Sequence, residues 1–527
     1  MQRTARRALW AFLVIVAGVQ GWLSRHAANT DGVGYLDQSD QFLAHGWHAP
    51  TNGYWSPLYP ALLAAARWMF GSGPALDYPL AHLVNFIVCI IAFGCGEWLR
   101  RELVEGDENV DHASSLLCIG LVGWAAIRLI GIAVTSPDMG VLACVLGAAA
   151  ALLRWRKTGS PIAAAALSLA LGLGYLMKAV MFPIAIVYLV IAVVVAPSDA
   201  RRWRRAPLMF LFFGAIALPQ VVAVSRLHGR PTFGQSGALN QAWHIGGVPG
   251  PLSEDHARPT KISVDSGISL VVDTSTNSAP RLFLIDGRAP GTFPIWSDVT
   301  RWYPRTIPFH VDWRRQVRKS VNAVRVETGP LLKFIFIPLL AWLLLGRPPW
   351  FRRGTPAGWT LVALGVVPLG LYALVNAELR LVAPFEMLVV LGLSRVLARA
   401  VPLALLAAAA IVAVGSALLN DVRSLPTLAP KRMQLMQLAA ALRDSSGGRP
   451  RVVALGDIWQ SPMYARLARA RVVAIMDDAD AARWWRGSAL ERAPVEARLD
   501  SIPGAFVIAR SPDRAAPAPG GWSAVPG

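Results

Sequence analysis

The stretch PIAAAALSLALGLGYLMKAVMFPIAIVYLVIAVVVAP (161–197) contains a single charged side chain, that of Lys178. An α-helix needs about 20 mainly apolar residues to cross the hydrocarbon core of a bilayer. The stretch is long enough for two such helices, and Lys178 marks the tight turn between them. We therefore expect a fold set by a membrane rather than by a water-soluble core.

Similar apolar windows recur along most of the chain. Of its 527 residues, 54% are hydrophobic and 16% are charged, whereas about a quarter are charged in soluble domains. We predict eleven spans, near 8–24, 79–98, 114–134, 137–154, 161–178, 180–197, 207–225, 331–346, 358–376, 381–398 and 401–419. The stretch SPLYPALLAAARWMFG (56–71) is too short to cross and predicts an amphipathic helix on the membrane surface. The predicted fold class is an α-helical polytopic membrane protein with outer surface helices.

The formal net charge of +19 would suggest nucleic-acid binding in a soluble protein. In a membrane protein, Lys and Arg instead collect in cytoplasmic loops. With a cytoplasmic N-terminus, the short inner segments hold seventeen Lys and Arg, and the short outer ones hold four, Arg25, Arg67, Lys178 and Arg380. This asymmetry predicts that the C-terminus lies outside and that no nucleic acid is a partner. The richness in Ala and Arg is typical of a bacterial source, so we expect a multi-pass protein of the bacterial inner (plasma) membrane.

The predicted topology divides the chain into four parts. Residues 1–225 form an N-terminal transmembrane module with the first outer loop, and residues 226–330 form a large outer loop. Residues 331–419 form the C-terminal transmembrane helices, and residues 420–527 form an outer soluble domain. Within that domain, RVVALGDIWQSPMYARLARARVVAIMDD alternates strand, helix and strand patterns, which predicts a small α/β unit.

Charged residues from distant parts of the chain fall on the outer side in this topology. Asp31 follows the first span, Asp138 precedes the fourth, and Lys178 ends the fifth, while Glu378 and Arg380 begin the tenth. A charge at bilayer depth costs about 2.5–3.5 kcal/mol, so such groups usually pair or line a cavity. Simpler interpretations stay open, since Lys178 can extend to the headgroups, Asp138 can cap a helix, and Glu378 with Arg380 can form a structural ion pair.

Three further charges allow the same two interpretations. Arg128 lies within the third predicted span and is a third cation that either extends to the headgroups or binds an anionic ligand. Asp37 and Asp40 follow Asp31 in NTDGVGYLDQSDQFLAHG (29–46), and for them we expect the solvated face of a short helix, because exposed acids are common.

Carboxylates beside cations at the outer edge of a membrane suit one kind of chemistry. A phosphate carried on a lipid is bound by Arg or Lys through charge-assisted hydrogen bonds. A hydroxyl group that attacks a sugar carbon needs a carboxylate as general base. No glycine-rich loop for a nucleotide phosphate is present, which fits a lipid-phosphate donor better than a nucleotide sugar.

Four motifs resemble those of the C-class (GT-C) polytopic glycosyltransferases, which use polyprenyl-phosphate sugars and include the protein O-mannosyltransferases and the lipid A aminoarabinose transferases. They are DGVGYLDQSDQFLAHG, NGYWSPLYPALLA, LGLGYLMKAVMFPIAIV and ELRLVAPFEMLVVLG. The resemblance implies a GT-C-like fold over most of residues 1–400. Two positions depart from the family pattern: Gly32 stands where a second acid often follows the first aspartate, and Leu381 stands where an aromatic residue usually follows the arginine.

The resemblance implies roles for the charged residues. Asp31 is expected to be the general base and Asp138 a second acidic residue at the site. Lys178 and Arg380 are expected to hold the donor phosphate, with Glu378 orienting Arg380, and Arg128 is a further candidate for that phosphate. No metal ligands are assigned, and the cofactor is unknown, with a divalent cation left open.

Aromatic residues of the outer segments are candidates for binding the substrate. This set comprises Tyr35, Tyr54, Trp55, Trp243 and His244, with Trp296, Trp302, Tyr303 and His310 as further members of the outer loop. Aromatic rings stack on sugars, but Trp and Tyr also favour the membrane interface. Both interpretations stay open.

The sequence thus predicts a membrane glycosyltransferase that moves a sugar, hexosyl or pentosyl, from a polyprenyl-phosphate donor to a hydroxyl acceptor on the outer face, with inversion. Membrane lipids and an acceptor glycan, lipid or protein are the expected partners. The alternative is a transporter or flippase of polyprenyl-linked glycans, which should show repeated halves and charges near the membrane midplane. A third possibility is a non-catalytic membrane scaffold, for which the converging charges would be a coincidence.

Overall fold

The computed structural model describes most of the chain. The described residues are 2–27, 29–104, 108–196, 201–248, 270–272, 280, 282–285, 291–303, 309–326, 329, 356–396, 400–446, 449–456 and 461–509. The predicted span at 331–346 lies outside them. Every other predicted span coincides with a helix in this part of the chain.

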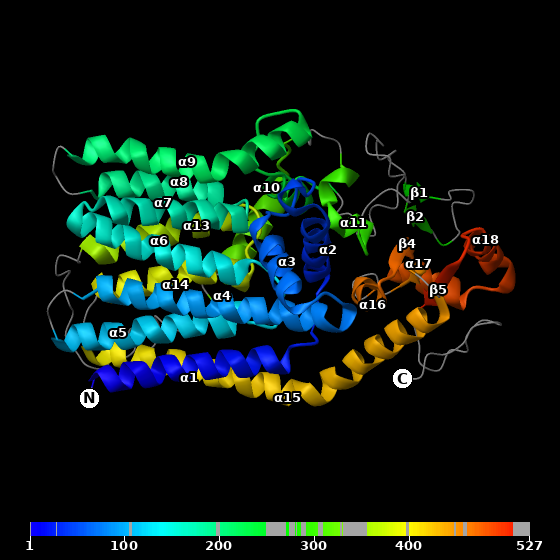
Figure 1. The fold of residues 1–527 in the computed structure, drawn as a ribbon, viewed down its shortest axis with the longest axis horizontal. Helices are drawn as coiled ribbons and strands as arrows, with labels where there is room; N and C mark the ends of the chain where they lie inside the picture. Colours follow the sequence, from blue (N-terminus) through cyan, green and yellow to red (C-terminus); the bar gives the residue numbers. More distant parts are fainter. Residues whose placement is uncertain are drawn as a thin grey trace.

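A bundle of long helices makes up one half of the molecule (Figure 1). Its helices are α1 (Gln2–Leu23), α4 (Pro74–Glu102), α5 (Glu108–Gly123) with the π-helical turn η2 (Trp124–Ile130), α6 (Asp138–Thr158), α7 (Pro161–Met177), α8 (Met181–Val194), α9 (Arg201–His228), α13 (Pro356–Ala373), α14 (Leu379–Val396) and α15 (Ala400–Ser446). Among the described residues, seven helices are long and apolar enough to cross a membrane, and α7 and α8 are shorter apolar helices. The protein is therefore an α-helical polytopic membrane protein.

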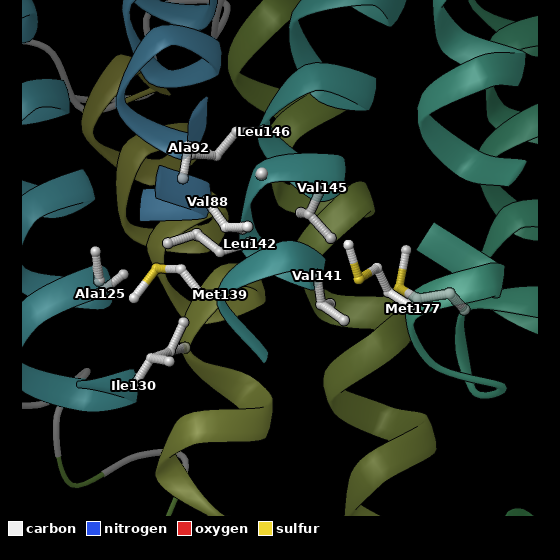
Figure 2. Packing of buried hydrophobic residues seen from close by; sticks show 14 of the residues in the cluster. Val88, Ala92, Ala125, Ile130, Met139, Val141, Leu142, Val145, Leu146 and Met177 are labelled. Carbon is white, nitrogen blue, oxygen red and sulfur yellow. The ribbon is translucent and has the colours of Figure 1, made fainter. Parts of the chain in front are cut away.

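Helix α6 lies at the centre of the bundle. Its apolar window is 94% buried, and it packs against α4 on one side and α7 on the other. Figure 2 shows Leu142 and Leu146 of α6 beside Val88 and Ala92 of α4. A run of Ala and Leu along α6 is fully buried, because small side chains let helices approach closely in a membrane. This tight packing holds the first residue of α6 in a defined place at the end of the bundle.

Short helices cover the end of the bundle at which α6 begins. They are α2 (Thr30–His45), η1 (Gly46–His48), α3 (Leu58–Phe70), α10 (Ser236–His244), α11 (Pro294–Ser297) and η4 (Val299–Trp302). Helix α3 matches the surface helix predicted at 56–71, and its last turn exposes Trp68, Met69 and Phe70. An exposed apolar turn next to a transmembrane bundle is typical of a helix that lies in the membrane interface.

A small sheet lies beyond these helices (Figure 1). Its strands are β1 (Leu270–Val272), β2 (Phe283–Ile285), β3 (Arg451–Leu455), β4 (Arg471–Met476) and β5 (Ala505–Ala509), in the order β1-β2-β4-β3-β5. Strand β3 is parallel to β4 and β5, and β2 is antiparallel to β4, with Phe283 opposite Ile475. Helices α16 (Ser461–Leu467), α17 (Asp478–Arg486) and α18 (Ala489–Asp500) complete this unit.

The strand–helix–strand pattern predicted after residue 451 is confirmed by β3, α16 and β4. The sheet also contains β1 and β2, which come from the large outer loop. Helix α15 is 47 residues long and runs from the bundle to the sheet without a break at residue 420 (Figure 1). The outer loop and the C-terminal segment therefore build one structural unit together.

Candidate functional site

Five charged side chains meet where the bundle ends, and we call them the open cluster: Asp31, Asp138, Lys178, Glu378 and Arg380. The Arg380 guanidinium contacts all three carboxylates, at 3.3 Å from Asp31 Oδ2, 3.3 Å from Asp138 Oδ2 and 3.0 Å from Glu378 Oε2. The Lys178 ammonium lies 2.5 Å from Asp138 Oδ1. The structure thus brings together five of the six charged residues that the sequence predicted for the site.

Helix termini position the members of the open cluster. Asp31 lies in the first turn of α2 and Asp138 is the first residue of α6, while Lys178 caps the C-terminus of α7. A carboxylate at a helix N-terminus and a cation at a C-terminus both interact favourably with the helix dipole. Arg380, in contrast, lies near the N-terminus of α14, where a cation is disfavoured. Its three carboxylate partners compensate for that position.

The two aspartates differ in their surroundings. Asp138 is almost fully buried, and Ser136 donates a further hydrogen bond to its Oδ2 at 3.0 Å. Asp31 is partly exposed, and its second oxygen, Oδ1, accepts a hydrogen bond from the Trp296 indole at 3.1 Å. A carboxylate oxygen has two lone pairs, so Asp31 can accept a further proton or hydrogen bond from the solvent side.

Trp296 has a partner that the sequence did not predict. Its indole N–H donates to Asp31, while its backbone carbonyl accepts a hydrogen bond from the Trp55 indole at 3.0 Å. Trp55 itself is buried against Tyr35, with ring centroids 4.7 Å apart. The large outer loop thus contributes directly to the geometry of Asp31, through a residue predicted only as a surface for stacking.

Gly32 leaves no room for a second acid beside Asp31. A Cβ atom at this position would lie 2.8 Å from Thr135 Cβ and 2.9 Å from Asn29 Oδ1, which is closer than real Cβ contacts. In the described part of the chain, no group of three or more His, Cys, Asp or Glu side chains is arranged to hold a metal ion. The side chains placed here therefore offer two carboxylates with exposed surface, Asp31 and Glu378, next to cations.

Two of the predicted aromatic residues, Tyr35 and Tyr54, are close enough to the open cluster for its charges to act on their pKa values. Tyr35 is buried, and burial followed by the charges of Asp31 and Asp138 raises its pKa well above the usual range. Tyr54 contacts Trp55, Trp243 and Trp296, with centroid distances of 4.6, 5.9 and 6.4 Å. Burial also raises the pKa of the Tyr54 phenol, so both tyrosines stay neutral hydrogen-bonding groups beside the open cluster.

Other predicted aromatic residues lie further along the same surface. The Trp243 indole donates a hydrogen bond to the Tyr303 hydroxyl at 2.9 Å, and the ring of Trp243 packs towards Tyr54. His244 lies beside Lys319, whose Nζ is 3.2 Å from His244 Nδ1. Burial and then the Lys319 charge lower the pKa of His244, so its imidazole is neutral at pH 7.

Arg128, Tyr303 and His310 lie in other surroundings than the open cluster. The Arg128 side chain is exposed on η2, and no hydrogen bond or ion pair joins it to another residue that the structure describes. The backbone carbonyl of His310 accepts a hydrogen bond from Gln241. Tyr303 contacts Trp243, as above, and the Trp302 side chain lies outside the described part.

Asp37 and Asp40 correct an expectation. Asp37 is buried and Asp40 is 40% exposed, and both belong to a second ion cluster, which we call the buried cluster because its cations are buried: Asp37, Asp40, Asp77, Arg67 and Arg466. Arg466, from α16, lies 3.0 Å from Asp37, 2.5 Å from Asp40 and 2.8 Å from Asp77. Arg67, from α3, lies 2.8 Å from Asp40 and 2.9 Å from Asp77. This cluster joins the sheet unit to the surface helices and the bundle.

The pKa values of Asp37 and Asp40, the two aspartates of α2 in the buried cluster, shift in opposite directions. Burial raises the pKa of Asp37 and outweighs the opposing charge of Arg466. Burial also acts to raise the pKa of Asp40, but the hydrogen bonds and charges of Arg466 and then Arg67 bring it below its usual value. Asp37 also accepts hydrogen bonds from the backbone N–H and the hydroxyl of Thr292, at 2.7 and 2.8 Å. The cluster therefore fastens the outer loop as well.

Sequence reasoning missed Asp77, His82 and Asn85, although a signal for them exists. These polar residues interrupt the otherwise apolar stretch DYPLAHLVNFIVCIIAFG within α4. Polar side chains in a spanning helix usually face the bundle interior and find partners there. All three are buried. Arg466 carries no comparable signal, since its sequence context is that of an ordinary soluble helix.

Of three comparisons with known proteins, the one with solved structures gives matches. No family model matches the chain, and no curated protein matches it either. Among solved structures, the crystal structure of ArnT from Cupriavidus metallidurans in the apo state matches with a TM-score of 0.38 and 16% identity, covering 91% of each chain. The chain is similar to ArnT. The structure of the same protein bound to undecaprenyl phosphate matches with a TM-score of 0.37 and 15% identity, covering 90% of this chain and 91% of the other. At these values the function has to follow from the chain's own side chains.

Proposed function

We propose that the protein is a membrane glycosyltransferase that moves a sugar from a polyprenyl-phosphate donor to a hydroxyl group of an acceptor on the outer face of the membrane. The observation that carries the proposal is Arg380, which contacts Asp31 and Asp138 at the end of the bundle with Lys178 beside them. Two cations next to a partly exposed carboxylate are the groups that phosphate departure and hydroxyl attack require.

The position of the open cluster supports a donor carried on a lipid. Asp138, Lys178 and Arg380 lie at or near the ends of α6, α7 and α14, which is the level expected for the headgroups of a bilayer around such helices. The phosphate of a polyprenyl phosphate lies at this level while its chain stays among the apolar helices. A transporter site, in contrast, is expected near the membrane midplane. The cluster therefore favours the transferase over the transporter.

The reaction that this arrangement favours is a single displacement. The Asp31 carboxylate takes the proton of the acceptor hydroxyl as its oxygen attacks the anomeric carbon of the donor sugar. The bond between that carbon and the phosphate oxygen breaks, and the phosphate leaves with the electron pair. Lys178 and Arg380 stabilise the charge on the departing phosphate, so no protein acid is needed. One displacement inverts the configuration at the anomeric carbon.

Glu378 and Asp138 have supporting roles in this scheme. Glu378 holds the Nε side of the Arg380 guanidinium, and Asn376 donates a hydrogen bond to Glu378 Oε1 at 3.2 Å. Asp138 holds both cations at once. This keeps Lys178 and Arg380 on the same side of the cluster, where one phosphate can contact both.

The test uses the full-length protein in lipid nanodiscs with a panel of synthetic undecaprenyl-phosphate hexoses and pentoses. Native membranes supply the acceptor, and mass spectrometry measures the undecaprenyl phosphate that is released. Asp31→Asn should lower the rate by about 100-fold or more, as expected for the loss of a general base. Asp500→Asn, at an exposed position on α18, is the control and should keep the wild-type rate. A wild-type rate for Asp31→Asn would overturn the assignment.

A further inference from the structure

Two outer segments that carry the aspartates of the open cluster are both tied to helix α4. The His82 ring lies between them, with Nδ1 at 2.9 Å from the carbonyl oxygen of Ile132 and Nε2 at 2.9 Å from that of Ala27; a neutral ring donates its one N–H to one of these two carbonyls. The Asn85 amide, one turn further along α4, donates to the carbonyl oxygens of Ile132 and Val134, at 3.2 and 2.8 Å. His82 and Asn85 are both buried.

Ile132 is the point at which these hydrogen bonds meet. Its backbone N–H donates to Gln20 Oε1 at 3.0 Å, while its carbonyl faces both His82 and Asn85. Asn85 is itself oriented by Tyr59, whose hydroxyl donates to Asn85 Oδ1 at 2.8 Å. A buried backbone group without a partner is costly, so these side chains set the course of a segment that has no helix of its own here.

The two segments are also joined to each other just before the aspartates. The Thr135 N–H donates to Asn29 Oδ1 at 3.1 Å, and the Asn29 amide lies 3.4 Å from the Thr135 carbonyl oxygen. Asp31 follows Asn29 by two residues, and Asp138 follows Thr135 by three. The close approach of Gly32 to Thr135 leaves little freedom between them. The positions of Asp31 and Asp138 are thus both fixed relative to one helix, α4.

We propose that His82 and Asn85 are positioning residues for the glycosyl transfer: they hold the Ala27 and Ile132–Val134 segments so that Asp31 and Asp138 face Arg380 together. This inference rests on the proposed function. Packing alone does not require these residue types, because an apolar side chain would fill the same volume without the cost of burying polar atoms in a spanning helix. Their polar atoms reach backbone carbonyls of the two segments and Tyr59, and the hydrogen bonds to the carbonyls are the ones that bear on the site.

Two substitutions separate positioning from packing. His82→Phe keeps a ring of similar size and removes both nitrogens, and Asn85→Leu keeps the branching and removes the amide. We expect kcat to fall by about 10- to 100-fold in each, because small displacements of catalytic groups have effects of this size. The KM for the donor lipid should stay within about twofold, since neither residue contacts Lys178 or Arg380. His82→Gln, which keeps an N–H donor, should recover part of the loss.

A second measurement does not depend on activity. Amide hydrogen exchange of the full-length protein in nanodiscs should become faster around Ala27 and around Ile132 in His82→Phe and Asn85→Leu. Ile91→Ala, on the exposed side of α4, is the matched control and should change neither the exchange nor kcat. If one variant does not fold, as judged by its thermal unfolding, the other variant and His82→Gln provide the same two readouts.

The outcomes separate this inference from the proposed function. Wild-type kcat and unchanged exchange in both variants, with Asp31→Asn inactive, would overturn the positioning roles and leave the transferase in place. Wild-type kcat in Asp31→Asn would overturn both. A loss of kcat together with an equal rise in KM would also contradict the inference, because it would indicate damage to donor binding rather than misplaced aspartates.

Discussion

The open cluster and the buried cluster each contain three carboxylates and two cations, so each has one negative charge more than its positive charges. They differ in exposure. The difference lies in the cations: the side chains of Lys178 and Arg380 are each 26% exposed, whereas those of Arg67 and Arg466 are 6% and 7% exposed. Identical charge composition therefore serves two purposes: in the open cluster the cations can exchange a carboxylate partner for a ligand, and in the buried cluster they cannot.

The two clusters also connect different parts of the chain. The buried cluster joins α2, α3, α4 and α16, so it connects the sheet unit to the bundle through a single residue, Arg466. The open cluster joins termini of α2, α6, α7 and α14. Helix α2 carries members of both clusters, Asp31 at its start and Asp37 and Asp40 in its middle. Helix α2 is thus held in place by the buried cluster, which leaves the cations of the open cluster available for a ligand.

The largest effect is expected from Arg466→Met. Arg466 contacts Asp37, Asp40 and Asp77, and because Arg67 contacts only the last two, the removal of Arg466 leaves the buried Asp37 without a cation, which costs about 3–5 kcal/mol of unfolding free energy. Denaturant unfolding in detergent and limited proteolysis of the sheet unit would measure it. Arg423→Met, at an exposed position on α15, is the control. Equal stability of the two variants would show that the buried cluster is not structural.

Arg380→Gln should lower the transfer rate more than the stability, in contrast to Arg466→Met. We expect the transfer rate to fall by about 100-fold, because a cation that stabilises the departing phosphate is lost. The free energy of unfolding should change by less than in Arg466→Met, since Lys178 stays on Asp138 and the other carboxylates are partly exposed. Release of undecaprenyl phosphate and denaturant unfolding would be measured together. A strongly destabilised but active Arg380→Gln would reverse the functional distinction between the clusters.

Gly32→Ala tests how closely the outer segments are packed beside the open cluster. The added Cβ would meet Thr135 and the Asn29 side chain, and overpacking of this kind costs about 1–3 kcal/mol. Gly94→Ala is the control, because a methyl group at that position would have no atom within 4 Å and Ala is the better helix former. Unfolding of both variants in denaturant would be compared. An unchanged stability for Gly32→Ala would mean that the segments can move apart.

The smallest effect is a difference in pH dependence. The pKa of Asp40 is lowered in the folded protein, so the stability it contributes is present above its ordinary value of 3.8 and is lost as the pH falls through the lower folded value. Asp40→Asn should make the unfolding temperature less sensitive to pH below about 4. Asp500→Asn serves as the control. An equally steep acid profile in Asp40→Asn would assign the sensitivity to other groups.

Some of the candidate site could be predicted from residue type and sidedness alone. Charged residues are rare within apolar chains and cluster where helices end, which is how Asp31, Asp138, Lys178, Glu378 and Arg380 were found. The same reasoning placed Asp37 and Asp40 on a solvated face, which was wrong for the buried Asp37, while Asp40 is 40% exposed and ion-paired. Their partner, Arg466, is more than 400 residues away, and no periodicity within α2 reports a contact with a distant soluble helix.

The chain's own order of residues determined the spanning helices, the surface helix α3 and the strand–helix–strand pattern, because these depend on the length and period of apolar runs. Three-dimensional packing decided which charges pair, which aspartate stays exposed, and that the outer loop supplies Trp296 to Asp31 and strands β1 and β2 to the sheet. The physical reason is the different range of the interactions involved. Hydrophobicity acts on each segment by itself, whereas an ion pair or a hydrogen bond acts over a few ångströms between segments that only the folded chain brings together.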